Sequence, residues 1–393
     1  GEVVTPGADA VGDEGLTAQS LIEEEDDEIE LLAVDPMGDV TVDEVDELVD
    51  AVANAGESRT VTLSAAFAAD MAGKNATISL NNVNGYDIVI EGGNQVFTSA
   101  GANRFFSAVC PNGGSITLQN MALSGAGAGV EASGSAAGKV VLDGVTITGH
   151  AGNQAVGIAS GTVEINNSSI TNGSRAVSGT SGNVKTLVVF NTLIEGNRAG
   201  CGAALYPGSN TTATLTQCTI NNNVGTSDGG YAGGAIATDQ ASNVTLTVAQ
   251  CYFEGNAAPM AGTFGGSGGA IAVYHSDKCN LTVTDSYFKG NTATANQTVR
   301  NDGGAISVFM NGAERTATAT IENCVFEDNV ANDDGGAILF EGVSSGSASI
   351  NLTAAVRNST FIGNEGKQLS TGVAGGAIQV YSKAKVDFEY CTF

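Results

Sequence analysis

The sequence predicts an all-β fold: a single-stranded, right-handed parallel β-helix, or solenoid, with a short helix capping its amino-terminal end. Three observations predict this fold. Two short phrases alternate over residues 233–393, apolar residues recur upstream at a nearly constant period, and strand-like segments alternate with a period of two. Self-similarity of this kind is the signature of a solenoid, in which each coil contacts mainly its neighbours.

The first phrase is Gly-Gly-Ala-Ile, and the second is an aromatic residue followed three positions later by asparagine. The first phrase begins at Gly233, Gly268, Gly303, Gly335 and Gly375. The second phrase spans Phe253–Asn256, Phe288–Asn291, Phe326–Asn329 and Phe361–Asn364, and a fifth copy begins at Phe393. Each pair of phrases is interpreted as one coil.

The last apolar residue before each turn gives the period. The residues that mark the coils are Leu123, Ile147, Ile170, Ile194, Ile220, Phe253, Phe288, Phe326, Phe361 and Phe393. Their spacings are 24, 23, 24 and 26 residues, and then 33, 35, 38, 35 and 32. A coil of about two dozen residues suits three short strands and three turns, and the longer coils add larger loops. Because stacked coils lie about 4.8 Å apart, these residues are predicted to form an inward ladder.

Two further ladders follow from the same register. Small residues suited to a narrow interior corner lie two positions before the marker: Ser168, Thr192, Cys218, Cys251, Ser286, Cys324, Ser359 and Cys391. Asparagines lie three positions after it: Asn197, Asn223, Asn256, Asn291, Asn329 and Asn364. Asparagine tolerates the left-handed backbone of turns, and stacked asparagines bond to one another. These six are predicted to form a structural ladder at a turn.

The amino-terminal region divides into an acidic leader, residues 1–38, and a helical cap, residues 39–57, ahead of the β-helix at 58–393, which we expect to be truncated at its carboxy-terminal end. The run Glu23–Glu28 predicts a disordered leader, and it lacks the spaced pattern of a dedicated calcium loop. A helix is predicted over 41–54. Thr41 and Glu44 form a capping-box pattern, and Val45, Leu48, Val49 and Val52 share one face.

Charge separates the leader from the rest of the chain. The net charge is −27, and residues 1–58 hold 19 of the 42 acidic residues with no lysine or arginine. The sequence shows no basic patch, and its acidity argues against a nucleic-acid partner. No apolar run reaches the length of a membrane span.

The pairing of the two phrases resembles the repeat of the chlamydial polymorphic outer-membrane proteins over residues 233–393. It is also similar to β-helix repeats in other large bacterial surface proteins. The resemblance implies a secreted or surface-displayed bacterial protein, often an adhesin, and it carries over no catalytic residue. We expect attachment to a membrane or cell wall only through sequence beyond residue 393, and a monomeric fragment.

Cysteines and histidines give no sign of a metal or catalytic site. The seven cysteines are Cys110, Cys201, Cys218, Cys251, Cys279, Cys324 and Cys391. Four of them belong to the small inward ladder, where a buried thiol acts as a small hydrophobe. Neighbours in register rarely meet disulfide geometry, so Cys218 and Cys251 are expected to stay reduced. His150 and His275 are isolated, so neither zinc binding nor Cys/His catalysis is expected.

A polysaccharide lyase or glycoside hydrolase is the competing function, because parallel β-helices host such enzymes. These sites need several carboxylates on one face, for calcium or for acid–base work. The best cluster precedes the Gly-Gly phrases and comprises Asp228, Asp302, Asp333 and Asp334. Asp302, Asp333 and Asp334 are the candidate metal ligands, with calcium as the ion. The alternative is turn-forming aspartate before glycine, which needs no function.

Aromatic residues near the Gly-Gly phrases give a candidate binding surface. Alternation from the phrase onward places three of them outward: Tyr274, Phe309 and Tyr381. Glu341 takes the equivalent outward position in the intervening coil. Exposed aromatics on a rigid sheet suit contact with glycans or proteins, unless the long loops fold over them. Loops at 261–266 and 343–349 are a second candidate surface.

Together these features predict a non-catalytic bacterial cell-surface or secreted adhesin or stalk. It presents loops and a flat β-face to a host glycan or to a surface or matrix protein, and needs no cofactor. A purely structural spacer is a further alternative.

Overall fold

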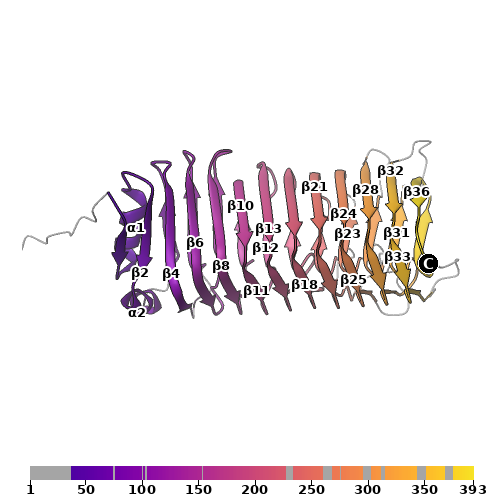
Figure 1. The fold of residues 1–393 in the computed structure, drawn as a ribbon, viewed down its shortest axis with the longest axis horizontal. Helices are drawn as coiled ribbons and strands as arrows, with labels where there is room; N and C mark the ends of the chain where they lie inside the picture. The colour runs from indigo at the N-terminus through magenta and orange to yellow at the C-terminus, as the bar shows by residue number, and fades with distance from the viewer. Residues whose placement is uncertain are drawn as a thin grey trace, which may run out of the picture. The chain divides into compact units, whose positions relative to one another are not determined.

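The structure is a computed structural model. It describes residues 37–73, 76–99, 101, 104–152, 154–226, 233–259, 268–274, 276–294, 302–310, 315–342, 351–367 and 375–393. Nearly all of the predicted leader therefore lies outside the described residues. In the described part, parallel strands from successive coils pair side by side along the solenoid (Figure 1). The predicted parallel β-helix is confirmed, since every strand pairing in this part of the chain is parallel.

The largest sheet, sheet A, contributes one strand per coil as far as β8 and two short strands per coil after it, until β36. Its strands are β1 (Val40–Val42), β2 (Arg59–Leu63), β4 (Asp87–Thr98), β6 (Ser115–Ser124), β8 (Lys139–Thr148), β10 (Gly161–Asn166), β11 (Ser169–Thr171), β13 (Lys185–Phe190), β14 (Leu193–Glu195), β17 (Thr211–Thr216), β18 (Thr219–Asn221), β21 (Ser242–Ala249), β22 (Tyr252–Glu254), β24 (Asp277–Thr284), β25 (Tyr287–Lys289), β28 (Ala317–Glu322), β29 (Val325–Glu327), β32 (Leu352–Arg357), β33 (Thr360–Ile362) and β36 (Ala384–Glu389). A left-handed residue such as Asn191 separates the two strands of a later coil.

Sheet B forms a second face with one strand per coil. Its strands are β3 (Ile78–Asn81), β5 (Phe106–Cys110), β7 (Val130–Gly134), β9 (Val156–Ile158), β12 (Val177–Gly179), β16 (Leu205–Tyr206), β20 (Ile236–Ala237), β23 (Ile271–Tyr274), β27 (Ile306–Phe309), β31 (Ile338–Glu341) and β35 (Ile378–Tyr381). Short strands form a third face: β15 (Arg198–Ala199), β19 (Val224–Gly225), β26 (Thr292–Ala293), β30 (Val330–Ala331) and β34 (Glu365–Gly366). The Gly-Gly-Ala-Ile phrase leads from the third face into sheet B.

The predicted marker ladder runs through the interior. Ile194 pairs with Ile220, and Ile220 pairs with Phe253. The phenylalanines then stack from coil to coil, with the ring centroids of Phe253 and Phe288 4.7 Å apart and their planes 7° apart. The marker side chains from Leu123 to Phe361 are buried and belong to one continuous core. Phe393 stacks on Phe361 but is 71% exposed, so the prediction of an inward residue is wrong there. The marker spacing in the sequence therefore gives the register of the coils.

The small residues two positions before each marker residue form hydrogen bonds with backbone groups at the bend between the two sheet A strands. Ser286 Oγ donates to the carbonyl oxygen of Thr284 at 2.7 Å and accepts the backbone N–H of Cys251 from the preceding coil at 3.1 Å. Cys251 Sγ does the same, with the carbonyl of Ala249 at 3.2 Å and the N–H of Cys218 at 3.4 Å. A hydroxyl or thiol is therefore required here for hydrogen bonding as well as for its size.

The asparagine ladder is present, but its backbone differs from the expectation. Asn291 Nδ2 donates to Asn329 Oδ1 at 3.0 Å, and Asn256 Nδ2 donates to Asn291 Oδ1 at 2.9 Å. The left-handed backbone lies one residue earlier, for example at Gly290 and Asp328, and not at the asparagines themselves. The ladder side chains from Asn197 to Asn329 are fully buried and Asn364 is partly buried, so they stabilise the turn from within.

Close backbone contacts account for both glycines of the first phrase. A Cβ on Gly303 would lie 2.2 Å from the carbonyl oxygen of Ile306 in the same turn. A Cβ on Gly304 would lie 2.0 Å from the carbonyl oxygen of Gly336 in the next coil. Real Cβ atoms do not approach backbone this closely. Tight backbone packing at the corner before sheet B therefore requires glycine at both positions.

Two short helices lie at the amino-terminal end of the solenoid (Figure 1). Helix α1 (Val45–Ala53) packs against β3 and buries Val45, Leu48, Ala51 and Val52, in agreement with the predicted apolar face except that Val49 is only partly buried. Its predicted start is wrong, because Thr41 belongs to β1. Glu44 is the N-cap residue, and its N–H donates to Glu47 at 3.3 Å.

The second helix, α2 (Ala65–Gly73), was not expected. Its Phe67 is fully buried and meets the Phe97 ring edge-on, with centroids 5.9 Å apart. Asp70 Oδ2 accepts the N–H of Val45 at 2.8 Å, which ties the two helices together at the first turn of α1. The alanine-rich segment has no strong amphipathic pattern, so periodicity gave no signal for it.

Candidate functional site

The three candidate aromatic residues occupy one column of sheet B, but their exposure differs from the expectation. Tyr274 pairs with Phe309 in register, and their rings stack with centroids 5.0 Å apart and planes 3° apart. Tyr381 follows two coils later, across Glu341. Tyr274 is only 3% exposed, so its ring is covered and not open, in keeping with the alternative that other parts of the chain fold over it, whereas Phe309 and Tyr381 are half-buried.

Glu341 is also buried, at 7% exposed, where an outward residue was expected. The outer side of sheet B is covered at neighbouring positions as well, because Ser307 and Leu339 are fully buried. Strand alternation gives the side of the sheet, but it does not show what packs over that side. The loops at 261–266 and 343–349, Asp228 and His275 lie outside the described residues.

Three predicted carboxylates do meet. One ligand atom from each of Asp302, Asp333 and Asp334 lies within 4.8 Å of the others, and all three residues are at most 2% exposed. Asp302 Oδ1 also accepts the N–H of Asp334 at 3.2 Å. Asp302 and Asp334 each precede the first glycine of a phrase, so consecutive coils bring them together. Close, buried carboxylates repel one another, and a hard divalent cation such as Ca²⁺ would offset that repulsion.

Calcium is expected to stabilise the chain through this cluster. Millimolar Ca²⁺ should raise the melting temperature of the wild-type chain, because a ligand present at 100 times its Kd adds about 2.7 kcal/mol. Asp333→Asn should lose most of that increase. Asp285→Asn is the matched control, since Asp285 is exposed and its Oδ1 accepts a hydrogen bond from Asn323 Nδ2 at 3.1 Å. Equal calcium responses in the two variants would leave the aspartates a turn-forming role.

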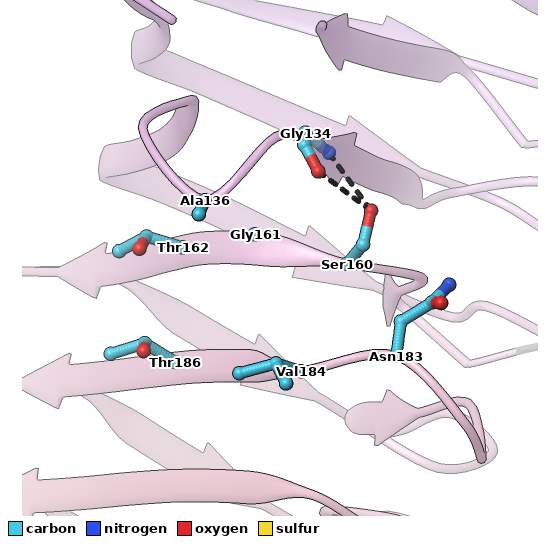
Figure 2. A pocket seen from close by; sticks show the side chains of 8 residues that line it. All are labelled: Gly134, Ala136, Ser160, Gly161, Thr162, Asn183, Val184 and Thr186. Atoms are coloured by element: carbon cyan, nitrogen blue, oxygen red, sulfur yellow. Dashed lines mark hydrogen bonds between the residues drawn. The ribbon is translucent and has the colours of Figure 1, made fainter.

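A shallow depression of about 500 Å³ lies where sheet B turns into sheet A. Small residues make room for it, and the residues that line it are Gly134, Ala136, Ser160, Gly161, Thr162, Asn183, Val184 and Thr186. Figure 2 shows Ser160 held against Gly134 by two hydrogen bonds, its Oγ donating to the carbonyl at 2.8 Å and accepting the N–H at 3.2 Å. Val184 is 77% exposed at one side.

The polar groups of the depression are all uncharged. Thr162 and Thr186 pair in register and lie on neighbouring strands, while Asn183 projects from the turn beside them (Figure 2). Asn183 Nδ2 donates to the carbonyl of Ala159 at 3.2 Å. None of the eight lining residues carries an acidic or basic side chain. The depression can therefore hydrogen-bond a neutral ligand, but it offers no general acid or base of its own.

A column of hydroxyl and amide side chains continues from the depression along sheet A. In register from coil to coil, it comprises Thr162, Thr186, Thr212, Thr245, Asn280, Thr318 and Thr353. We call this set the hydroxyl column. Thr162 and Thr186 are half-buried in the depression, and the other five residues are exposed. A second column of threonines lies two residues further along the strands: Thr214, Thr247, Thr282 and Thr320.

Sequence inspection overlooked these columns, although it held a signal for them. Threonine recurs at alternate positions in the strand before each marker, as in Thr212-Ala213-Thr214 and Thr245-Leu246-Thr247. Alternation places both threonines on the side opposite the buried residue between them. The aromatic residues predicted a binding surface on sheet B, whereas the exposed, regular columns of side chains lie on sheet A.

Comparison with known protein families agrees with this fold. A family model described as right handed beta helix region matches residues 107–293. A second model, the Chlamydia polymorphic membrane protein repeat, matches residues 323–341, which contain one copy of each phrase. The predicted β-helix and its resemblance to this repeat are thereby confirmed. The second model takes its name from membrane proteins of Chlamydia.

No curated protein and no solved structure matches the chain significantly. Neither helix in the described part of the chain is long and apolar enough to cross a membrane.

Proposed function

For this β-helix protein with a polymorphic-membrane-protein-like repeat, we propose a non-catalytic role as a surface-displayed adhesin or stalk that binds a neutral glycan. The observation that carries the proposal is the depression lined by Thr162, Asn183 and Thr186, which combines uncharged hydrogen-bonding groups with an exposed apolar side chain on a rigid sheet. Such a site suits the hydroxyl groups and apolar ring faces of a sugar.

The electrostatic setting also favours a neutral ligand. Beyond the acidic residues 1–58, the chain still has 23 acidic against 15 basic residues, and this excess of negative charge disfavours association with acidic polymers. Two bases lie beside the depression, and both ammonium groups are already engaged. Lys139 pairs with Glu164 at 3.3 Å, and the buried Lys185 donates to the carbonyls of Asn183 at 2.6 Å and Ser209 at 2.7 Å. A competing enzymatic role would depend on Asp302, Asp333 and Asp334, whose burial keeps them from direct contact with a polymer.

Glycan binding should weaken when the hydroxyl groups of the depression are removed. Thr162→Val and Thr186→Val keep the β-branched shape and each should lower the affinity about 3- to 10-fold, the effect of one neutral hydrogen bond. The measurement is titration calorimetry with a glycan identified by array screening. Thr219→Val is the matched control, because Thr219 lies on β18, outside the lining of the depression.

Other outcomes of this experiment would move or replace the proposal. Loss of binding only in Phe309→Ala or Tyr381→Ala would place the site on sheet B. Released oligosaccharide that disappears in Asp302→Asn would favour the lyase or hydrolase alternative. Absence of binding to any glycan or host matrix protein would favour a spacer.

A further inference from the structure

The depression is continuous with a much longer row of uncharged side chains. Thr162 and Thr186 line the depression and also begin the hydroxyl column, which continues through five more coils to Thr353. A ligand confined to the depression would contact only two members of the column. The geometry of the other five members therefore bears on the length of the ligand.

The column has a single repeat along the solenoid axis. Strands pair without a register shift from Thr162 to Thr353, so successive members lie about 4.8 Å apart. This distance is close to the length of one hexose unit in an extended β-linked polysaccharide. A polymer that runs along the axis can therefore place one sugar unit over each coil.

The exposed hydroxyl groups of this column are available for such a ligand. Thr318 Oγ1 donates to Asn280 Oδ1 at 2.7 Å, which links two members of the column. The hydroxyl groups of Thr212, Thr245 and Thr353 make no hydrogen bond to the described part of the chain. Water must satisfy them in the free protein, and a sugar hydroxyl can replace that water at little cost.

Charge limits the kind of ligand that the column can take. Its seven members are uncharged, although the chain as a whole is strongly acidic. Charged residues border it at both ends, with Lys139 before Thr162 and Lys385 after Thr353 in the same register. Beside it lie one residue of each sign, Glu164 two residues after Thr162 and Lys278 two residues before Asn280, so the flanks favour neither an acidic nor a basic polymer. The complementary ligand is therefore uncharged along the length of the column.

Area argues against a folded protein as the occupant. Seven members spaced about 4.8 Å apart, with one neighbouring column at about 6.6 Å, present a narrow strip on the order of 400 Å². A stable protein–protein interface buries about 800 Å² on each partner and has an apolar centre with aromatic anchors, which this strip lacks. A narrow linear polymer fits the strip better than a second copy of this chain or a host protein.

We propose that the ligand is an extended neutral polysaccharide that enters the depression and lies along the hydroxyl column, with one sugar unit per coil. This inference rests on the proposed function, because it assigns the class of glycan to the same site. Thr212, Thr245 and the residues beyond them are then binding residues outside the depression. They set the length of chain that the protein recognises.

The test is the dependence of affinity on ligand length. Neutral β-1,4-linked oligosaccharides of glucose, xylose and N-acetylglucosamine, from the disaccharide to the octasaccharide, are titrated into the full chain by calorimetry. The affinity for one of these series should rise with each added unit, by about tenfold or more between disaccharide and heptasaccharide, and then level off.

Two variants test whether the hydroxyl column beyond the depression binds the longer ligands. The double variant Thr212→Val with Thr245→Val removes hydroxyls beyond the depression, and Thr245→Arg blocks the column with a long side chain. Both should keep disaccharide affinity and lose the gain from longer ligands, whereas Thr219→Val should bind every length as the wild type does. Unchanged melting temperatures confirm that the variants are folded.

The outcomes separate the two proposals. Equal affinity for the disaccharide and the heptasaccharide would overturn the extended ligand and leave the glycan-binding site in the depression. Absence of binding at every length, in all three series, would overturn both. A length dependence that survives Thr245→Arg would also overturn the hydroxyl column as its cause.

Discussion

Replacing Gly304 by alanine is expected to destabilise the solenoid by about 3 kcal/mol, at the upper end of the cost of overpacking a tight interior. The new Cβ would lie 2.0 Å from the carbonyl oxygen of Gly336 and 2.6 Å from the backbone nitrogen of Val330. Both are backbone atoms of the next coil, so no side chain can rotate to relieve the contact. The coils must move apart, which strains strand pairing on either side.

The last copy of the phrase supplies a matched control. Gly376 occupies the same second position as Gly304, but the nearest atom to a Cβ there is the carbonyl oxygen of Asn364 at 3.8 Å. Gly376→Ala should therefore change the free energy of unfolding by less than about 1 kcal/mol. Urea denaturation of both variants measures the difference. Equal destabilisation would show that contact with the next coil is not what requires glycine at this position.

Periodicity explains how much of the fold could be predicted. A residue that recurs once per coil, such as Phe253, Phe288 and Phe326, stacks on its equivalents because strand pairing leaves no other register. The asparagine ladder follows for the same reason. Features that occur once carry no such signal, and helix α2 with its buried Phe67 could not be found from a repeat.

The candidate sites show the same boundary. The proximity of Asp302 and Asp334 could be predicted from the sequence, because each precedes a Gly-Gly phrase and the two phrases belong to consecutive coils. The burial of Tyr274 could not be predicted, since alternation along a strand does not show what covers the outer side of sheet B. Burial of an outward position depends on packing beyond the strand, and loop lengths here change from coil to coil.

The inward ladders and the outer hydroxyl column are linked by the same register. Each strand that carries a column residue also buries alternate residues in the core, as Val244 and Leu246 do on either side of Thr245. The column can shift only if the core ladder shifts with it. A rigid interior therefore keeps the binding groups in place, which lowers the entropy lost when a long ligand binds.

Replacing Asn291 by alanine should have a comparably large effect, because its side chain makes four hydrogen bonds in a fully buried position. Its Oδ1 accepts the backbone N–H of Asn256 at 3.1 Å and Asn256 Nδ2 at 2.9 Å. Its Nδ2 donates to the carbonyl of Phe253 and to Asn329 Oδ1, both at 3.0 Å. Alanine leaves two buried donors without acceptors, at about 1–3 kcal/mol each, for a total of about 3 kcal/mol.

Hydrogen exchange can locate this loss within the chain. Protection of the Asn256 backbone amide should fall about 100-fold in Asn291→Ala, because that amide donates directly to the missing side chain. Amides several coils away should change much less, since each coil depends mainly on its neighbours. Asn280→Ala is the control. Asn280 lies close to Asn256 in the sequence but is exposed, so removing its side chain should leave the Asn256 amide protected. Unchanged protection of Asn256 in Asn291→Ala would mean that a water molecule accepts the hydrogen bonds that Asn291 Oδ1 accepts in the wild type. The buried turn would then be accessible to water.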